Sequence, residues 1–170
     1  MRPLSGQAYT PTMKHIITTF LALTLMACGP TYLYEKEQAV PQTGWSYENS
    51  QEFIFSIRDT SQLYALHLRL GHSPEFFAQN LYVKVYTTFP NGEELAEEVS
   101  LQLADKFGQW YGDCDAENCQ IDIPIQPVAY FEQAGEYKIR VAQHSRREPL
   151  EGVSGVGFAV EVLGNELPAG

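Results

Sequence analysis

The chain has 170 residues and a formal net charge of −10 at pH 7, with 21 Asp and Glu against 11 Lys and Arg. A surface of this charge repels phosphate backbones, so the composition argues against nucleic acid as a partner. A length of this order suits a single domain that buries its own core.

Residues 13–28, MKHIITTFLALTLMAC, form the first distinctive stretch. It opens with Lys14, continues as an apolar run, and ends with a small residue before Cys28. A basic start, an apolar middle of roughly 7–15 residues and small residues before the cut are typical of a secretory signal. The run is shorter than the about 20 apolar residues that span a bilayer. We therefore predict a signal peptide over residues 1–27, with Met13 as the favoured translation start.

The Leu-x-Ala-Cys sequence that ends this stretch resembles the lipobox of bacterial lipoproteins. The resemblance implies that signal peptidase II cuts before Cys28 and that its thiol and new amino terminus are acylated. An ordinary signal peptide, or a buried helix, with a chance cysteine is the alternative. The 143 residues from Cys28 onward carry a formal net charge of −12, because Arg2 and Lys14 leave with the signal and no acidic residue does. They contain no second apolar segment of spanning length, so we expect the lipid on Cys28, and no other cofactor, to hold the protein at the membrane.

The segment after the signal has the composition of a linker, and β patterns follow it. Residues 28–44 combine prolines, glycines and mixed charge with little periodicity, which predicts a flexible tether. Trp45 and Tyr47 then mark the start of the globular part. An acidic stretch at 93–98 is interpreted as a loop or one helical turn, and Pro124 indicates that its strand lies at a sheet edge.

Apolar and polar residues alternate in short runs through the rest of the chain, which is the pattern of half-buried strands. Turn signals such as Pro90-Asn91-Gly92 separate the runs. The alternating runs fall at 52–58, 63–70, 80–89, 99–103, 120–125, 137–142 and 156–163. We predict an all-β fold, a single antiparallel β-sandwich over residues 45–163, followed by a polar tail over 164–170.

Cys114 and Cys119 are spaced C-x4-C in a chain that is expected to leave the reducing cytoplasm. A disulfide that closes this small loop is the favoured interpretation, and two free thiols are the alternative. A metal site would need further ligands, and the nearest histidine in sequence is His144. No metal is therefore expected.

No catalytic signature is present in the sequence. His67, His72 and His144 stand in no metal-binding spacing, and Ser73 lies in GHSPE instead of the G-x-S-x-G of a nucleophile elbow. The abundant acidic residues leave a carboxylate pair for sugar hydrolysis open, but no two of them are singled out. We expect a protein that is not an enzyme.

Three places are richer in aromatic or basic residues than a sandwich requires: 68–82, the turn at 108–112, and the basic pair in the loop at 145–149. Exposed aromatic and arginine side chains favour protein interfaces. The alternative is structural, with arginines that close turns and aromatic rings that cap the core. The candidates for partner contact are Arg69, Phe76, Phe77, Trp110, Arg146 and Arg147.

Three blocks follow the lipobox cysteine in order: FIFSIRDTSQLYALHLRLGHSPEFFAQNLYVKVYTTFPNGE, GQWYG and AGEYKIRVAQHSRREPLEGVSGVGFAVEV. They cover most of residues 53–162. In their order and spacing the chain resembles the gliding motility lipoprotein GldH family of Bacteroidetes-type bacteria.

The resemblance implies a non-enzymatic accessory lipoprotein, tied to rapid movement over surfaces and to the associated export of cell-surface proteins, or to a broader envelope role. Its partners would be envelope proteins of a gliding or secretion machinery. Cys28 alone transfers as a site residue, the attachment point of lipid such as palmitate. Gly29, with no aspartate there, resembles a signal for the outer membrane, with the periplasmic or outer face left open. The alternative function is a glycan-binding envelope lipoprotein that uses Tyr82, Tyr86 or Trp110 as a stacking platform.

Overall fold

The computed structural model describes residues 29–165 of the chain. The predicted signal peptide and Cys28 lie outside these residues. From Thr31 onward the described residues belong to one compact unit. Nine strands and no helix occur among residues 29–165, so no helix there is long and apolar enough to cross a membrane. The strands are β1 (Tyr32–Ala39), β2 (Gln51–Ile57), β3 (Leu63–His72), β4 (Asn80–Thr88), β5 (Glu94–Gln102), β6 (Asp113–Cys114), β7 (Cys119–Ala129), β8 (Gly135–Gln143) and β9 (Val153–Gly164).

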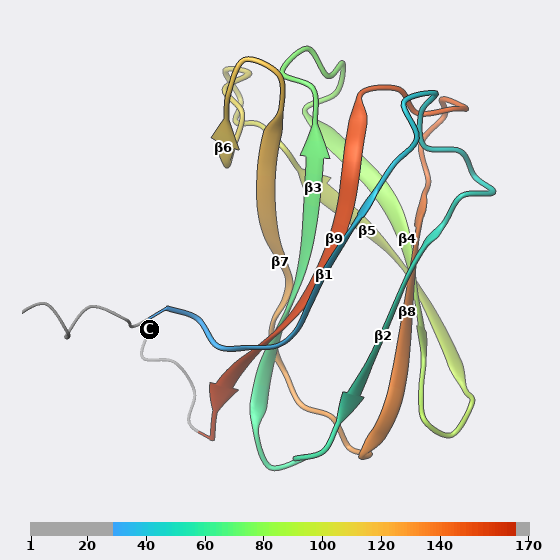
Figure 1. The fold of residues 1–170 in the computed structure, drawn as a ribbon, viewed down its shortest axis with the longest axis vertical. Coiled ribbons are helices and arrows are strands. Elements are labelled where there is room, and N and C mark those ends of the chain that lie inside the picture. The colour runs from blue at the N-terminus through green and yellow to red at the C-terminus, as the bar shows by residue number, and fades with distance from the viewer. Residues whose placement is uncertain (1–28, 166–170) are drawn as a thin grey trace, which may run out of the picture. The chain divides into compact units, whose positions relative to one another are not determined.

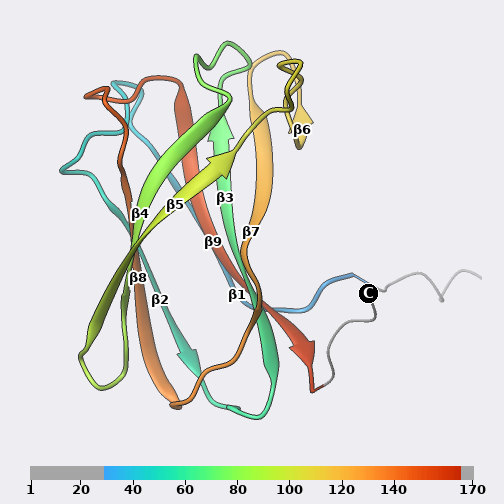
Figure 2. The same ribbon diagram turned by 180° about the vertical axis from the view of Figure 1, so that it is seen from behind.

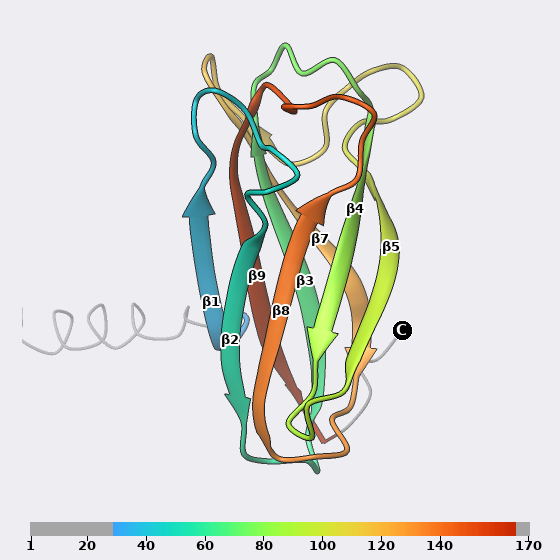
Figure 3. The same ribbon diagram turned by 90° about the vertical axis from the view of Figure 1, so that its right-hand side faces the viewer.

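The strands form two antiparallel sheets (Figure 1). The five-stranded sheet has the order β1-β9-β3-β7-β6, and the four-stranded sheet has the order β2-β8-β4-β5. Figure 3 shows the four-stranded sheet in front of the five-stranded sheet, as two layers. The prediction of an all-β, antiparallel sandwich is confirmed.

The core lies between the two sheets and follows the period of two in the sequence. In β2, Phe53, Phe55 and Ile57 are buried while the residues between them are exposed. The ring centroid of Phe158, in β9 of the other sheet, lies 5.8 Å from that of Phe53 and 5.9 Å from that of Phe55. Because successive side chains of a strand point to opposite faces, one face of each strand supplies the core that joins the sheets.

Strand β1 corrects the predicted tether over residues 28–44. Its residues pair with β9 from Tyr32 opposite Glu161 to Ala39 opposite Gly155, so residues 32–39 belong to the sheet. β1 is an edge strand with mostly exposed side chains, and only Tyr34 packs against the core, with its ring centroid 5.6 Å from that of Phe55. A strand with so little apolar surface has the composition of a linker, which is why the prediction was wrong here.

Strand β5 corrects the interpretation of the acidic stretch at 93–98 as a loop or helical turn. Residues from Glu94 onward pair with β4 at the edge of the four-stranded sheet, where acidic side chains are exposed to solvent. Charged residues on such an edge discourage pairing with other sheets. The edge position of Pro124 is confirmed, because β6 pairs only with the first two residues of β7.

The loops gather at the two ends of the sandwich (Figure 2). One end carries the loops 40–50, 73–79, 103–112, 115–118 and 144–152, and we call it the tryptophan end because it includes Trp45 and Trp110. The opposite end carries the loops 58–62, 89–93 and 130–134. β9 runs from the tryptophan end to the opposite end, and the start of β1 pairs near the end of β9.

Candidate functional site

The loop between β8 and β9 carries the adjacent arginines, and a buried glutamine holds it in shape. We call residues 144–149 the arginine loop. Gln143 is 2% exposed, and its Nε2 donates to the carbonyl of Arg147 at 3.2 Å and to the Glu148 carboxylate at 2.9 Å. Its Oε1 accepts from the backbone N–H and the hydroxyl of Ser145, both at 2.9 Å. One side chain thus satisfies polar groups from both sides of the loop.

The neighbouring loop between β1 and β2 ties the arginine loop down further. The Tyr47 hydroxyl donates to the carbonyl of Ser145 at 2.6 Å, and the Tyr47 N–H donates to Glu148 Oε2 at 3.0 Å. The backbones of Trp45 and Leu150 exchange two hydrogen bonds of 2.9 Å, and both side chains are fully buried. Hydrogen bonds from Gln143 and from the loop between β1 and β2 therefore hold the arginine loop in one conformation.

Replacement of Gln143 by alanine should lower the free energy of unfolding by roughly 1–3 kcal/mol, because it leaves buried or half-buried polar groups without partners. Urea denaturation measures the loss, and faster amide exchange at Ser145 would report the loosened loop. The control is Gln126→Ala, since exposed Gln126 makes one hydrogen bond, of 3.2 Å, to the Val128 carbonyl. Equal stability of the two variants would contradict the role assigned to Gln143.

The arginine loop stands beside an exposed aromatic ring. The Arg147 guanidinium lies 3.8 Å from the ring centroid of Phe77, a residue that is 49% exposed. Arg146 is also exposed, and neither arginine forms an ion pair within residues 29–165. The two positive charges therefore stand unneutralised on a domain whose net charge is strongly negative.

A hollow of about 710 Å³ lies between the arginine loop and β4, and we call it the Phe77 groove. Apolar groups come from Phe77, Leu81 and Tyr82, and basic groups come from the two arginines. Glu98 is the acidic residue in its lining, 3.5 Å from His144 Nε2. A second hollow, of about 330 Å³ at the opposite end, has Glu93 and Glu132 in its lining and no basic residue.

The other predicted contact residues do not join this groove. Phe76 is buried, 6% exposed, and packs between His72 and Phe77 as the structural interpretation expected. Trp110 is half-buried, and its Nε1 donates to the Pro74 carbonyl at 2.9 Å while its ring packs on His72 at 4.7 Å. Both residues therefore pack in the interior of the tryptophan end.

Arg69 lies on the outer face of the five-stranded sheet and is neutralised there. It binds the carboxylates of Glu35 and Asp122, the latter at 2.8 Å, and it lies over the ring of Tyr32 at 5.0 Å. Burial lowers the pKa of Arg69, but the hydrogen bonds to the two carboxylates outweigh this and raise it above its usual range. Arg69 therefore joins β1 to β3 and β7.

The aromatic residues of the glycan alternative do not form one stacking platform. The face of Tyr86 is covered by the guanidinium of Arg140, 3.6 Å from the ring centroid. Trp110 faces His72, as described above. Tyr82 is 44% exposed, and it lines the Phe77 groove.

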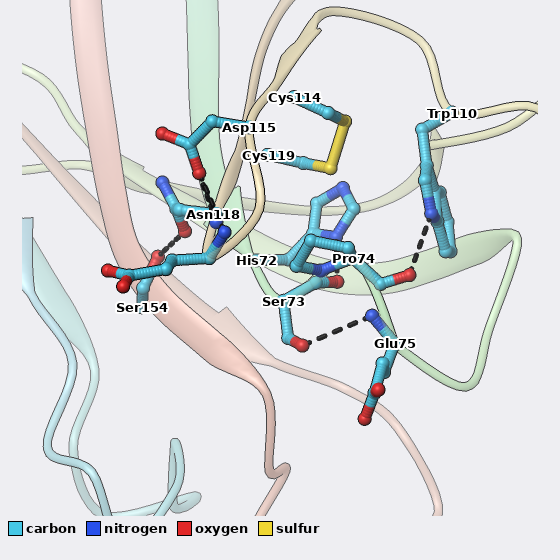
Figure 4. Close-up of a disulfide and its surroundings, with 11 residues drawn as sticks. His72, Ser73, Pro74, Glu75, Trp110, Cys114, Asp115, Asn118, Cys119 and Ser154 are labelled. Atoms are coloured by element: carbon cyan, nitrogen blue, oxygen red, sulfur yellow. Dashed lines mark hydrogen bonds between the residues drawn. A yellow bond between two sulfur atoms is a disulfide. The ribbon is translucent and has the colours of Figure 1, made fainter.

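Cys114 and Cys119 are joined by a disulfide with an S–S distance of 2.02 Å (Figure 4). It closes a loop in which Asp115 Oδ1 accepts hydrogen bonds of 2.8 Å from the backbone N–H groups of Glu117 and Asn118. These hydrogen bonds lower the pKa of Asp115. Among residues 29–165 there is no group of three or more His, Cys, Asp or Glu side chains that could hold a metal ion.

Comparison with known proteins gives a matching family and a curated relative. The family described as GldH lipoprotein matches residues 32–160. The chain is similar to "Gliding motility lipoprotein GldH" of Flavobacterium johnsoniae, with 24% identity over 155 residues that cover 85% of this chain and 94% of that protein. A solved structure described as "Structure of infectious bursal disease virus Gx strain" aligns with 12% identity and a TM-score of 0.23, over 98% of this chain and 39% of that chain. That similarity is too low to support a structural argument.

Proposed function

The chain belongs to the GldH lipoprotein family, and on that premise we propose that it is a lipid-anchored, non-enzymatic accessory component of a gliding motility apparatus. The name of the Flavobacterium johnsoniae relative supports this, since the similarity covers 85% of this chain and 94% of that protein. The associated protein-secretion machinery of the cell envelope belongs to the same proposal. Deletion of the protein should abolish the spreading of colonies over a surface, and unchanged spreading would contradict the proposal.

The proposed anchor is lipid on Cys28, at the outer membrane. Three residues, 29–31, separate Cys28 from β1, so fully extended chain from Cys28 to Tyr32 reaches about 14 Å at most. The lipid would thus hold the sandwich close to the bilayer, at the part of the domain where β1 begins. The tryptophan end, with the arginine loop, lies at the other end of β1 from Tyr32 (Figure 1).

The observation that carries the proposed mechanism is the Phe77 groove with its rigid arginine loop. Arginine and aromatic side chains dominate the binding energy of protein interfaces. Here both kinds flank one hollow, and Gln143 and Tyr47 fix the loop in advance, so little conformational entropy is lost on binding. We propose that the groove receives an acidic segment of an envelope protein, because its two arginines lack ion-pair partners among the described residues.

Reversal of the two charges, Arg146→Glu with Arg147→Glu, should reduce recovery of partner envelope proteins with the tagged lipoprotein by roughly tenfold or more, since truncation of a single central interface residue already costs about 2 kcal/mol. Colony spreading should fall with it. Membrane-bound amounts of the lipoprotein should stay unchanged.

The matched control for this prediction is Lys36→Glu with Arg58→Glu. Both residues are exposed and lie away from the Phe77 groove, and the change in net charge is the same. Equal loss of partner recovery in the two double variants would show that only overall charge matters and would contradict docking at the groove.

A further inference from the structure

His72 is a fully buried histidine at the end of β3, with 0% of its surface exposed. Its Nδ1 lies 2.8 Å from the Ser73 carbonyl oxygen. A carbonyl only accepts hydrogen bonds, so Nδ1 carries the ring proton. Burial lowers the pKa of His72 and so favours the neutral ring, and this effect outweighs the hydrogen bond to the Ser73 carbonyl, which raises the pKa. Nε2 is therefore a bare acceptor, and it has no hydrogen-bond partner in the described structure.

The residue opposite His72 across the sheet is Cys119. The β3–β7 register pairs the two residues directly, which places their side chains on the same face, with Cβ atoms about 4.5–5.5 Å apart. Figure 4 shows the His72 ring beside the Cys119 end of the disulfide. The rings of Trp110, at 4.7 Å, and Phe76, at 5.6 Å, close other sides of His72.

The disulfide offers no hydrogen-bond donor to this acceptor. A sulfur in a disulfide has no proton to donate, whereas a cysteine thiol has one. An unsatisfied buried acceptor is unfavourable, and buried polar groups in folded proteins are nearly always paired. The environment of His72 Nε2 is thus complementary to the reduced form of Cys119.

The two sulfurs differ in their access to solvent. Cys114 is exposed at the rim of the tryptophan end, while Cys119 is 0% exposed. Thiol–disulfide exchange proceeds by attack of a thiolate on an accessible sulfur, and the other sulfur is the leaving group. Attack therefore falls on Cys114, and Cys119 is released next to His72.

We propose that Cys114–Cys119 is a site of thiol–disulfide exchange with a protein dithiol of the thiol oxidoreductase class, in which His72 is a positioning residue that accepts the released Cys119 thiol. The proposal rests on this geometry alone and is independent of the proposed function.

The exchange has two balanced steps. One thiolate of the partner attacks Cys114 Sγ, which forms a mixed disulfide and breaks the Cys114–Cys119 bond. The Cys119 thiolate takes a proton from water and donates it as S–H to His72 Nε2. The second thiolate of the partner then attacks the mixed disulfide and releases Cys114, so the partner is oxidised by two electrons and this disulfide is reduced by two.

The test compares the full-length lipoprotein, purified in detergent, with its His72→Phe variant, which keeps an aromatic ring and removes the acceptor. Dithiothreitol is the probe dithiol, and alkylation followed by mass spectrometry measures the reduced fraction. The equilibrium constant for reduction should be roughly three- to tenfold smaller in His72→Phe, because the reduced form loses one hydrogen bond. A tenfold change corresponds to about 30 mV. His144→Phe, at an exposed histidine, is the control and should leave the constant unchanged.

Two measurements on the unmodified protein keep the proposal testable if His72→Phe does not fold. Exchange with glutathione should place the mixed disulfide on Cys114, and reduction should shift the ¹⁵N resonance of His72 Nε2 as it gains a donor. A mixed disulfide on Cys119, an unmoved resonance, or equal equilibrium constants in the wild type and His72→Phe would each overturn the proposal.

Discussion

Replacement of Phe158 by alanine is expected to lower the free energy of unfolding by about 3–5 kcal/mol. Phe158 is 1% exposed in a central strand, and its ring packs on Phe53 and Phe55 of the facing sheet. Removal of the ring opens a cavity where the two sheets meet, and neighbours held in both sheets cannot collapse into it. Domains of this size are stable by only about 5–15 kcal/mol, so the variant should lose a large part of its stability.

Urea denaturation followed by circular dichroism measures this loss, and Phe107→Ala is the matched control. Phe107 is 83% exposed, so its replacement should change stability by no more than about 0.5 kcal/mol. A Phe158 variant as stable as the control would contradict the assignment of the core to the contact between β9 and β2.

Replacement of Cys28 by alanine is expected to abolish attachment of lipid completely, since Cys28 carries the only thiol that the lipobox presents for acylation. Each buried methylene of an acyl chain contributes about 0.8 kcal/mol to membrane binding, so loss of all chains removes the proposed anchor. Incorporation of labelled palmitate measures the effect directly.

The control for this prediction removes the other two cysteines, Cys114→Ser with Cys119→Ser. That variant should take up palmitate at the level of the wild type. Label retained in Cys28→Ala, or lost from the control, would contradict the assignment of Cys28 as the lipid attachment site.

Much of the fold could be predicted because apolar and polar residues alternate in strands that have one buried face. Phe53, Phe55 and Ile57 show the pattern, and the structure buries all three. The family resemblance, drawn from three sequence blocks, is confirmed by the match over residues 32–160. Strand β1 and the acidic first half of β5, residues 94–98, escaped prediction because they lie at sheet edges, where polar and acidic residues face solvent on most sides.

The sequence singled out residues of the candidate site but did not show that they lie side by side. Phe77 and Arg147 were both singled out, but 70 positions separate them, and only the packing of loops at the tryptophan end brings them together. The sequence also contained an unused signal. Gln143 and His72 each follow an apolar alternation, Ile139-Val141 and Leu68-Leu70, at the next inward position. A polar residue at such a position is expected to be buried, as both residues are.

The central claim is that the Phe77 groove, and not the opposite end of the sandwich, contacts an envelope protein. Photo-crosslinking in living cells tests it most directly, with p-benzoylphenylalanine in place of Tyr82 in the groove or of Tyr130 at the opposite end. Both tyrosines are exposed, at 44% and 70%, so the control position is the more accessible of the two. We predict a crosslinked partner from position 82 that disappears when Arg146 and Arg147 are both changed to Glu, and none from position 130. A partner crosslinked from position 130 alone, or one at position 82 that persists after the charge reversal, would contradict the claim.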